Sequence, residues 1–198
     1  MSKIALSGNA SGTGTLTIAA PNTNTDRTLT LPDNTGTVVT TGSTAGVSQA
    51  MLASGVAGTG PAFSAYASGT QSGLTHNVYT KVLFDTEEFD TNSNYSSSRF
   101  TPTVAGYYQI NGNVTSPVTN TSYGLTTVIY KNGILYKTGA ASKANGAMYP
   151  SSLVSSIVYL NGSTDYVEIY AYGDMGGAWN TTGSIYFTFF NGAMIRSA

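Results

Sequence analysis

The stretch RFTPTVAGYYQINGNV, residues 99–114, decides the fold of this chain. From Gly106 onward its side chains alternate, with Tyr108, Ile110 and Val114 in one set of positions and mostly polar side chains in the other. Successive side chains of a β-strand point to opposite faces of the sheet. The alternation therefore predicts a half-buried strand that lays one face on a hydrophobic core.

Similar runs follow this strand and are separated by turn signals. Asn132-Gly133 lies between the apolar runs 128–130 and 134–136. Asn-Gly favours the type I′ turn, because both central residues of that turn need a positive φ. The sequence therefore predicts a tight hairpin at this point.

A second hairpin is predicted where residues 161–164 join the runs 156–160 and 166–172. The last strand is predicted to begin at Ile185 and to continue to Ile195. Short strands with turn signals at roughly ten-residue spacing, and no amphipathic helix, are typical of a sandwich or jelly roll. The fold class predicted is all-β: a jelly-roll β-sandwich head of about eight to ten antiparallel strands.

The N-terminal part differs from the head, because it holds only short strings that alternate Thr with aliphatic residues. These strings are residues 14–18, 27–31 and 36–40. Their few aliphatic side chains cannot offset about 1–2 kcal/mol of backbone entropy per ordered residue, so the segment is expected to attach to a larger body or to wrap with other copies. The predicted organisation is an extended β-rich attachment or trimerisation segment, 1–42, a Gly/Ser/Ala-rich linker or neck, 43–61, and the jelly-roll head, 62–198.

The composition excludes several classes of protein. Charged residues make up 9% of the chain and the net charge is −1, which speaks against nucleic acid as a partner. There is no Cys, so disulfide frameworks and thiolate metal sites are excluded. Hydrophobic residues make up 40% of the chain, which predicts an ordered protein. No signal-peptide core and no membrane-spanning apolar run is seen, so we expect synthesis in the cytoplasm without membrane insertion.

Four motifs in the head resemble the globular-head family of complement's q subcomponent, within the jelly-roll superfamily that also holds tumour necrosis factor. They are the opening Gly-Pro-Ala-Phe-Ser-Ala-Tyr at 60–66, the Phe-x-Pro-x-x-x-Gly-x-Tyr core at 100–108, the hairpin at 130–133 and the aromatic-rich ending at 189–195. The resemblance implies a homotrimer with its N- and C-termini at the base. The loops and the stalk, which has no Gly-X-Y repeat, depart from the family.

The N-terminal segment carries a second resemblance. Residues 19–38, AAPNTNTDRTLTLPDNTGTV, resemble a segment common at the start of tail-fibre and other appendage proteins of marine tailed bacteriophages. The two resemblances together imply a trimeric virion appendage, with its N-terminus fixed to other virion proteins and its head facing outward.

The sequence has few residues that could form a catalytic site or a metal site. His76 is the one histidine and is expected to be a surface loop residue, and no nucleophile elbow or phosphate loop is present. The protein is therefore expected not to be an enzyme. Asp85, Glu87, Glu88 and Asp90 form an acidic cluster that suits a solvated loop, a Ca²⁺ ion near a trimer axis, or an acid/base pair. These three alternatives stay open at this point.

Aromatic side chains offer the best candidates for ligand binding, because rigid amphipathic rings can stack on sugars. Packing at a sheet or subunit face is the alternative for most of them. The aromatic candidates are Tyr107, Tyr123, Tyr149, Tyr166, Tyr170, Tyr172 and Trp179. The Gly-rich loop 173–180 is predicted to be a ligand-binding loop, with Asp174, Trp179 and Asn180 as its binding residues, on the premise that Trp179 is exposed.

The function predicted from these observations is that of a homotrimeric tail fibre or related virion fibre whose head contacts a host-surface glycan or protein. An architectural capsid decoration or head fibre is the first alternative. A carbohydrate-active enzyme is the distant one.

Overall fold

The computed structural model describes residues 11–14, 17, 22–26, 28, 60–118, 120, 122–144, 146 and 149–198. The chain divides into two units, Met1–Val38 and Val39–Ala198, and the second holds the head. The strands predicted within 1–42 and the linker predicted at 43–61 fall almost wholly outside the described residues. Over the part that is described, no helix is long and apolar enough to cross a membrane.

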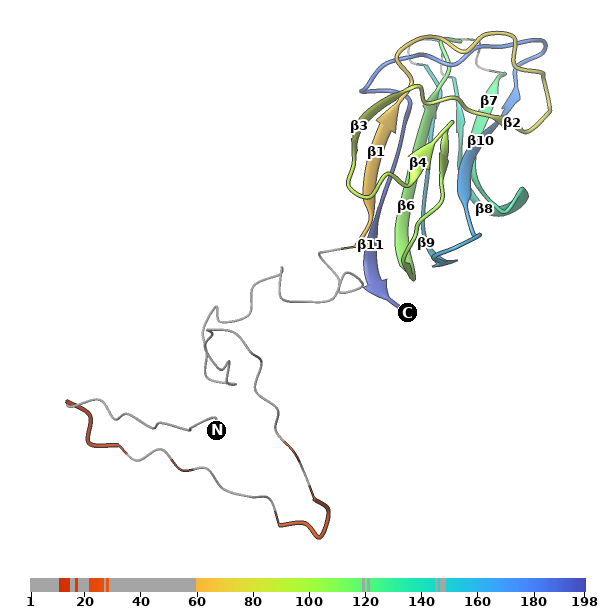
Figure 1. The fold of residues 1–198 in the computed structure, drawn as a ribbon. Coiled ribbons are helices and arrows are strands. Elements are labelled where there is room, and N and C mark those ends of the chain that lie inside the picture. The colour runs from red at the N-terminus through yellow and green to blue at the C-terminus, as the bar shows by residue number, and fades with distance from the viewer. Residues whose placement is uncertain are drawn as a thin grey trace. The chain divides into compact units, whose positions relative to one another are not determined.

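The described head consists of antiparallel strands in two sheets (Figure 1). The first sheet has the order β3-β1-β11-β6-β9, and the second the order β4-β5-β10-β7-β8, with β2 paired to β10. The strands are β1 (Ala62–Tyr66), β2 (Thr80–Lys81), β3 (Thr86–Asp90), β4 (Tyr95–Ser96), β5 (Arg99–Phe100), β6 (Ala105–Thr115), β7 (Gly124–Lys131), β8 (Ile134–Lys143), β9 (Ser151–Asn161), β10 (Val167–Asp174) and β11 (Phe189–Ser197). The all-β sandwich predicted from the sequence is confirmed.

Strand β6 forms as its alternation predicts. Tyr108, Ile110 and Val114 are fully buried in the core, while Tyr107 on the other face is exposed. The Tyr108 hydroxyl donates a hydrogen bond to the Val104 carbonyl oxygen at 2.6 Å, which satisfies its one polar atom inside the core. The strand therefore buries one face between the sheets, and on its other face Tyr107, Gln109 and Asn111 are at least partly exposed.

Aromatic packing closes the core between the two sheets. The ring of Phe63 on β1 stacks on that of Phe100 on β5, with 4.3 Å between their centroids, and meets Phe190 on β11 edge-on at 4.7 Å. Phe100 in turn meets Tyr108 at 5.6 Å. The three sequence motifs that hold these rings therefore converge on one cluster, although they lie far apart in the chain.

The two ends of the head lie at the same end of the sandwich. Strand β1 is antiparallel to β11, with Ala62 opposite Ala193, so the chain enters the head close to where it leaves it (Figure 1). The hydrogen bond from the Met194 amide to the Pro61 carbonyl oxygen, 3.0 Å long, holds the two segments together there. A stalk that joins β1 would therefore meet the head beside its C-terminus.

The hairpin at Asn132-Gly133 is confirmed. Both residues have a positive φ, 53° for Asn132 and 78° for Gly133, as a type I′ turn requires. The turn joins β7 to β8, which pair with Lys131 opposite Ile134.

The second predicted hairpin is wrong, because β9 and β10 belong to different sheets. Strand β9 pairs with β6, and β10 pairs with β7. The connection crosses between the sheets around Asn161, whose Oδ1 accepts hydrogen bonds from the amides of Ser163, Thr164 and Asp165. A short polar loop between two apolar runs suits either a hairpin or such a crossing, and the alternation does not distinguish them.

The last strand begins at Phe189 and not at the predicted Ile185. A turn precedes it, in which the Ser184 carbonyl oxygen accepts hydrogen bonds from the amides of Phe187 and Thr188. The side chains of Ile185, Tyr186 and Phe187 are exposed on this turn. The apolar run therefore spans a turn as well as a strand.

Candidate functional site

The loop predicted to bind ligand is built around a buried tryptophan. Trp179 is only 2% exposed, so the exposure assumed from the sequence is wrong. Its backbone pairs with Leu74, and its indole Nε1 donates a hydrogen bond to the Thr75 carbonyl oxygen at 3.3 Å. Gly173 lies against the ring, since a Cβ on this glycine would come within 2.5 Å of a ring carbon. Trp179 is therefore a packing residue of this loop.

The other two predicted binding residues differ in their roles. The Asn180 side chain accepts a hydrogen bond from the Gly73 amide at 3.1 Å, so it holds two loops together. The Asp174 side chain is 63% exposed, and its Oδ1 lies 3.8 Å from His76 Nδ1. That same Nδ1 accepts hydrogen bonds from the amides of Met175 and Gly176, so His76 anchors the loop. Ligand binding by this loop stays a prediction, and of its three predicted binding residues only Asp174 is exposed.

The carboxylates of the acidic cluster accept hydrogen bonds from different partners. Asp85 accepts two bonds from Ser68, Glu88 accepts one from the Ser64 hydroxyl, and Asp90 accepts one from the Tyr95 amide. Among the described residues, no three His, Cys, Asp or Glu side chains are grouped so that they could hold a metal ion. A Ca²⁺ ion at a trimer axis would take ligands from several copies and stays a prediction.

Asp85→Asn is expected to leave the oligomeric state unchanged and to lower stability at neutral pH by under about 1 kcal/mol. The two hydrogen bonds from Ser68 hold the pKa of the Asp85 carboxyl below its ordinary value. A carboxyl whose pKa is lower in the folded state stabilises the fold at pH values above its unfolded-state pKa. This stabilisation is lost as the pH falls through the folded-state pKa. The stability difference between parent and variant should therefore disappear in acid. Thermal unfolding between pH 2 and pH 7 measures it.

Added Ca²⁺ is a further readout for the same variant. If Ca²⁺ raised the melting temperature of the parent and Asp85→Asn abolished that rise, Asp85 would be an ion ligand and its assignment as a loop anchor would be wrong.

The free face of the first sheet carries a hydrogen-bonded ladder of amides and hydroxyls across β9, β6 and β11. Gln109 Nε2 donates to the Ser155 hydroxyl at 2.9 Å, and that hydroxyl donates to Asn111 Oδ1 at 2.8 Å. Asn111 Nδ2 then donates to Asn191 Oδ1 at 3.0 Å. Neither of the described strands β6 and β9 places a charged side chain on this face.

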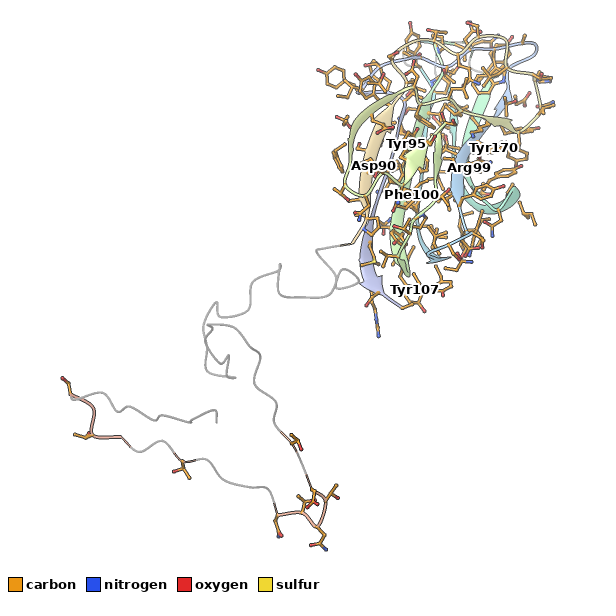
Figure 2. The ribbon with its side chains drawn as sticks, viewed as in Figure 1. Asp90, Tyr95, Arg99, Phe100, Tyr107 and Tyr170 are labelled. Carbon is orange, nitrogen blue, oxygen red and sulfur yellow. The ribbon has the colours of Figure 1, made fainter. Side chains whose placement is uncertain are left out.

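Exposed apolar side chains flank the ladder. On this face they are Phe89, Tyr107, Leu153, Ile157, Tyr159 and Ile195. Ile157, Tyr107 and Tyr159 also line a groove of about 610 Å³ at the end of the sandwich where the chain terminates, and Figure 2 shows Tyr107 there. Arg196 of β11 also lines this groove. Apolar groups collected on one face of a sheet, with few charges among them, are typical of a surface that another protein covers. We name this surface the assembly face.

A second polar site, on the other sheet, was not predicted as a unit. Glu168 on β10 is almost completely buried, and its Oε1 accepts from Lys81 Nζ at 2.7 Å and from Arg99 Nε at 2.9 Å. Beside it is a pocket of about 540 Å³, lined by Lys81, Ser93, Asn94, Ser96, Ser97, Arg99, Thr101 and Thr103. The sequence contains one sign of this site, a single carboxylate between two apolar residues in Val167-Glu168-Ile169. The alternation places Glu168 on the face away from the core.

The fold is a two-sheet jelly roll similar to that of complement globular heads and tumour necrosis factors. The globular domain of zebrafish complement 1qA protein is 17% identical, with 70% of this chain and 99% of that chain covered and a TM-score of 0.52. Eiger tumour necrosis factor from S. frugiperda is 11% identical, with 70% and 95% covered and a TM-score of 0.52. Murine APRIL is 12% identical, with 68% and 98% covered and a TM-score of 0.50.

These similarities confirm the fold that the motifs in the head implied, and at such identities they show the fold alone. No protein-family model matches the chain, and no curated protein matches it.

Proposed function

We propose that this protein is a homotrimeric, non-catalytic fibre protein of a bacteriophage virion, a tail fibre or a related appendage, whose head contacts the host surface. The observation that carries the proposal is the assembly face. A sheet face that exposes Tyr107, Ile157 and Tyr159, and on which β6 and β9 carry no charged residue, is costly in water and suits burial against further copies of itself.

The amide ladder supports copies of this chain as the occupants of the assembly face. Gln109, Asn111 and Asn191 each have both donor and acceptor atoms, so the same ladder on a neighbouring copy can satisfy them. Closed symmetric assembly is the usual outcome when one surface meets itself or a neighbouring patch on identical chains. The resemblance of the head motifs implies three copies.

The virion assignment is supported by the resemblance of residues 19–38 to the start of phage appendage proteins. The placing of the first head strand beside the C-terminus supports a fibre, because three stalk segments would enter at one end and leave the opposite loops facing outward. Three heads on one fibre would raise the effective affinity for a surface by avidity, by about 10²–10⁴.

Light scattering on the purified full-length protein, beside a version that starts at Gly60, tests the proposal. We expect three times the chain mass for both, since the assembly face belongs to the head. A monomeric full-length protein would contradict the proposal. Gold-labelled antibodies against residues 62–198 would then be expected at fibre tips on virions, whereas label spread evenly over the capsid would identify a decoration protein.

A further inference from the structure

The outward face of the second sheet carries five tyrosines in one cluster, which we name the tyrosine face. Its members are Tyr79, Tyr130, Tyr166, Tyr170 and Tyr172. Tyr130 stacks on Tyr170 with 3.9 Å between ring centroids, and Tyr79 lies 5.0 Å from Tyr172 and 6.2 Å from Tyr130. Each of these rings remains partly exposed, so the cluster is not part of the core.

The hydroxyls of these tyrosines are available to a ligand. In the described parts of the head, none of the five hydroxyls makes a hydrogen bond, whereas the hydroxyls of the buried Tyr95 and Tyr108 each donate one. The hydroxyl of a buried tyrosine usually has a hydrogen-bond partner in the protein, whereas that of an exposed tyrosine is hydrated. The tyrosine face therefore offers ring surfaces for stacking together with free hydroxyls at their rims.

Two cations lie at one end of the tyrosine face. The Arg99 guanidinium lies 3.8 Å from the centre of the Tyr166 ring, and Figure 2 shows Arg99 beside Tyr170. Lys81 lies opposite Tyr170 in the pairing of β2 with β10. Both cations share one carboxylate oxygen of Glu168, so the site holds one more positive than negative charge. Arg99 uses only its Nε for this pair, and its side chain is 44% exposed.

The pocket next to these cations is lined by hydroxyls and an amide. Its volume of about 540 Å³ lies within the range of small-ligand sites, roughly 300–1,000 Å³. Ser93, Ser96, Ser97, Thr101 and Thr103 supply hydroxyls that can both donate and accept. Such a lining suits a polyhydroxylated ligand better than an apolar one.

We propose that the tyrosine face and this pocket bind an acidic saccharide. The CH face of a sugar ring would stack on the tyrosine rings, its hydroxyls would bond the Ser and Thr side chains, and its carboxylate or sulfate would pair with Arg99 and Lys81. The inference rests on the proposed contact of the head with the host surface. The tyrosine face and the assembly face lie on opposite outer surfaces of the sandwich, so the site stays open in a trimer.

An array of neutral, uronic-acid-containing, sialylated and sulfated glycans, probed with the full-length protein, tests the proposal. We expect retention on one or more acidic glycans and not on their neutral counterparts, with retention falling as salt is raised. Tyr170→Phe removes a hydroxyl and keeps the ring, and Arg99→Gln removes the free charge. Arg99→Gln should weaken binding at least about tenfold, the effect of losing a hydrogen bond to a charged group, and Tyr170→Phe by about two- to tenfold, the effect of losing a neutral one.

Lys137→Gln and Tyr136→Phe are the matched controls, because Lys137 Nζ lies 5.2 Å from the Tyr136 ring on β8, outside the cluster. Both should bind as the parent does. The fluorescence of the single tryptophan checks that each variant is folded.

Three outcomes would each overturn the inference. They are no retention on any acidic glycan, equal retention on the neutral glycans, and unchanged binding by Arg99→Gln and Tyr170→Phe. Adhesion of the protein to host cells that the two variants leave unchanged would overturn the site and leave host attachment standing. A monomer in light scattering would contradict the proposed fibre independently of the array.

Discussion

Ile157→Glu is expected to convert the proposed homotrimer into folded monomers. Ile157 is 52% exposed on β9, the edge strand of the assembly face, and lies opposite Gln109 on β6. Burial of an unpaired carboxylate at this position, and the meeting of like charges from several copies, each cost several kcal/mol. Because the side chain points away from the core, the fold of one chain should survive. Light scattering measures the mass, and circular dichroism checks the fold.

Ile134→Glu is the matched control for this prediction. Ile134 is 73% exposed, more than Ile157, but lies on β8 of the second sheet. The same change of residue should therefore leave the trimer intact. If Ile157→Glu stayed trimeric at micromolar concentration, or if Ile134→Glu dissociated equally, the assembly face would be wrongly assigned.

The sequence predicted most reliably those features that depend on neighbouring residues. The alternation of 106–114 fixes which side chains of β6 are buried, and the Asn-Gly pair fixes a turn that only a positive φ permits. Both are local consequences of backbone geometry. The regular spacing of the turn signals indicated the sandwich, and the resemblance of the motifs that hold Phe63, Phe100 and Phe190 pointed to the same fold.

Pairing between distant strands could not be predicted in the same way. The runs that became β9 and β10 have the pattern of a hairpin, but each has a better partner, β6 and β7, elsewhere in the chain. Alternation gives the buried face of a strand and not its neighbour. The crossing at Asn161 therefore became visible only in the structure.

The candidate site was predicted only in part for the same reason. Alternation places Glu168 on an outward face, but nothing local shows that Lys81 and Arg99 reach it from 87 and 69 residues away. Tyr166, Tyr170 and Tyr172 were predicted to be candidates for sugar stacking, whereas Tyr79 and Tyr130 were not. Their contacts depend on how β2 and β7 meet β10.

Trp179 shows how composition can mislead. Gly-rich loops are usually exposed, so a tryptophan inside one suggested a binding residue. Here Gly173 makes room for the buried tryptophan, since it has no Cβ to displace the indole ring. An accurate prediction would have needed the contact with Leu74, which lies about a hundred residues earlier and forms only in the folded head.

Trp179→Ala is therefore expected to lower the free energy of unfolding by about 3–5 kcal/mol, the usual cost of removing a large buried aromatic side chain. The buried indole ring packs against Gly173, and its Nε1 donates a hydrogen bond to the Thr75 carbonyl oxygen, so its removal leaves a cavity and a carbonyl without this partner. Urea unfolding followed by circular dichroism measures the loss, at equal concentrations of parent and variant because oligomers gain stability with concentration.

The matched control is Tyr186→Ala, an aromatic residue on the neighbouring turn that is 80% exposed. Its removal should change the free energy of unfolding by no more than about 0.5 kcal/mol, as is usual for surface positions. The parent also has a second readout, because its single tryptophan should emit at short wavelength when folded and shift to longer wavelength on unfolding. If Trp179→Ala instead unfolded at the urea concentration of the parent and lost glycan binding, Trp179 would be a ligand contact, and its assignment to packing would be wrong.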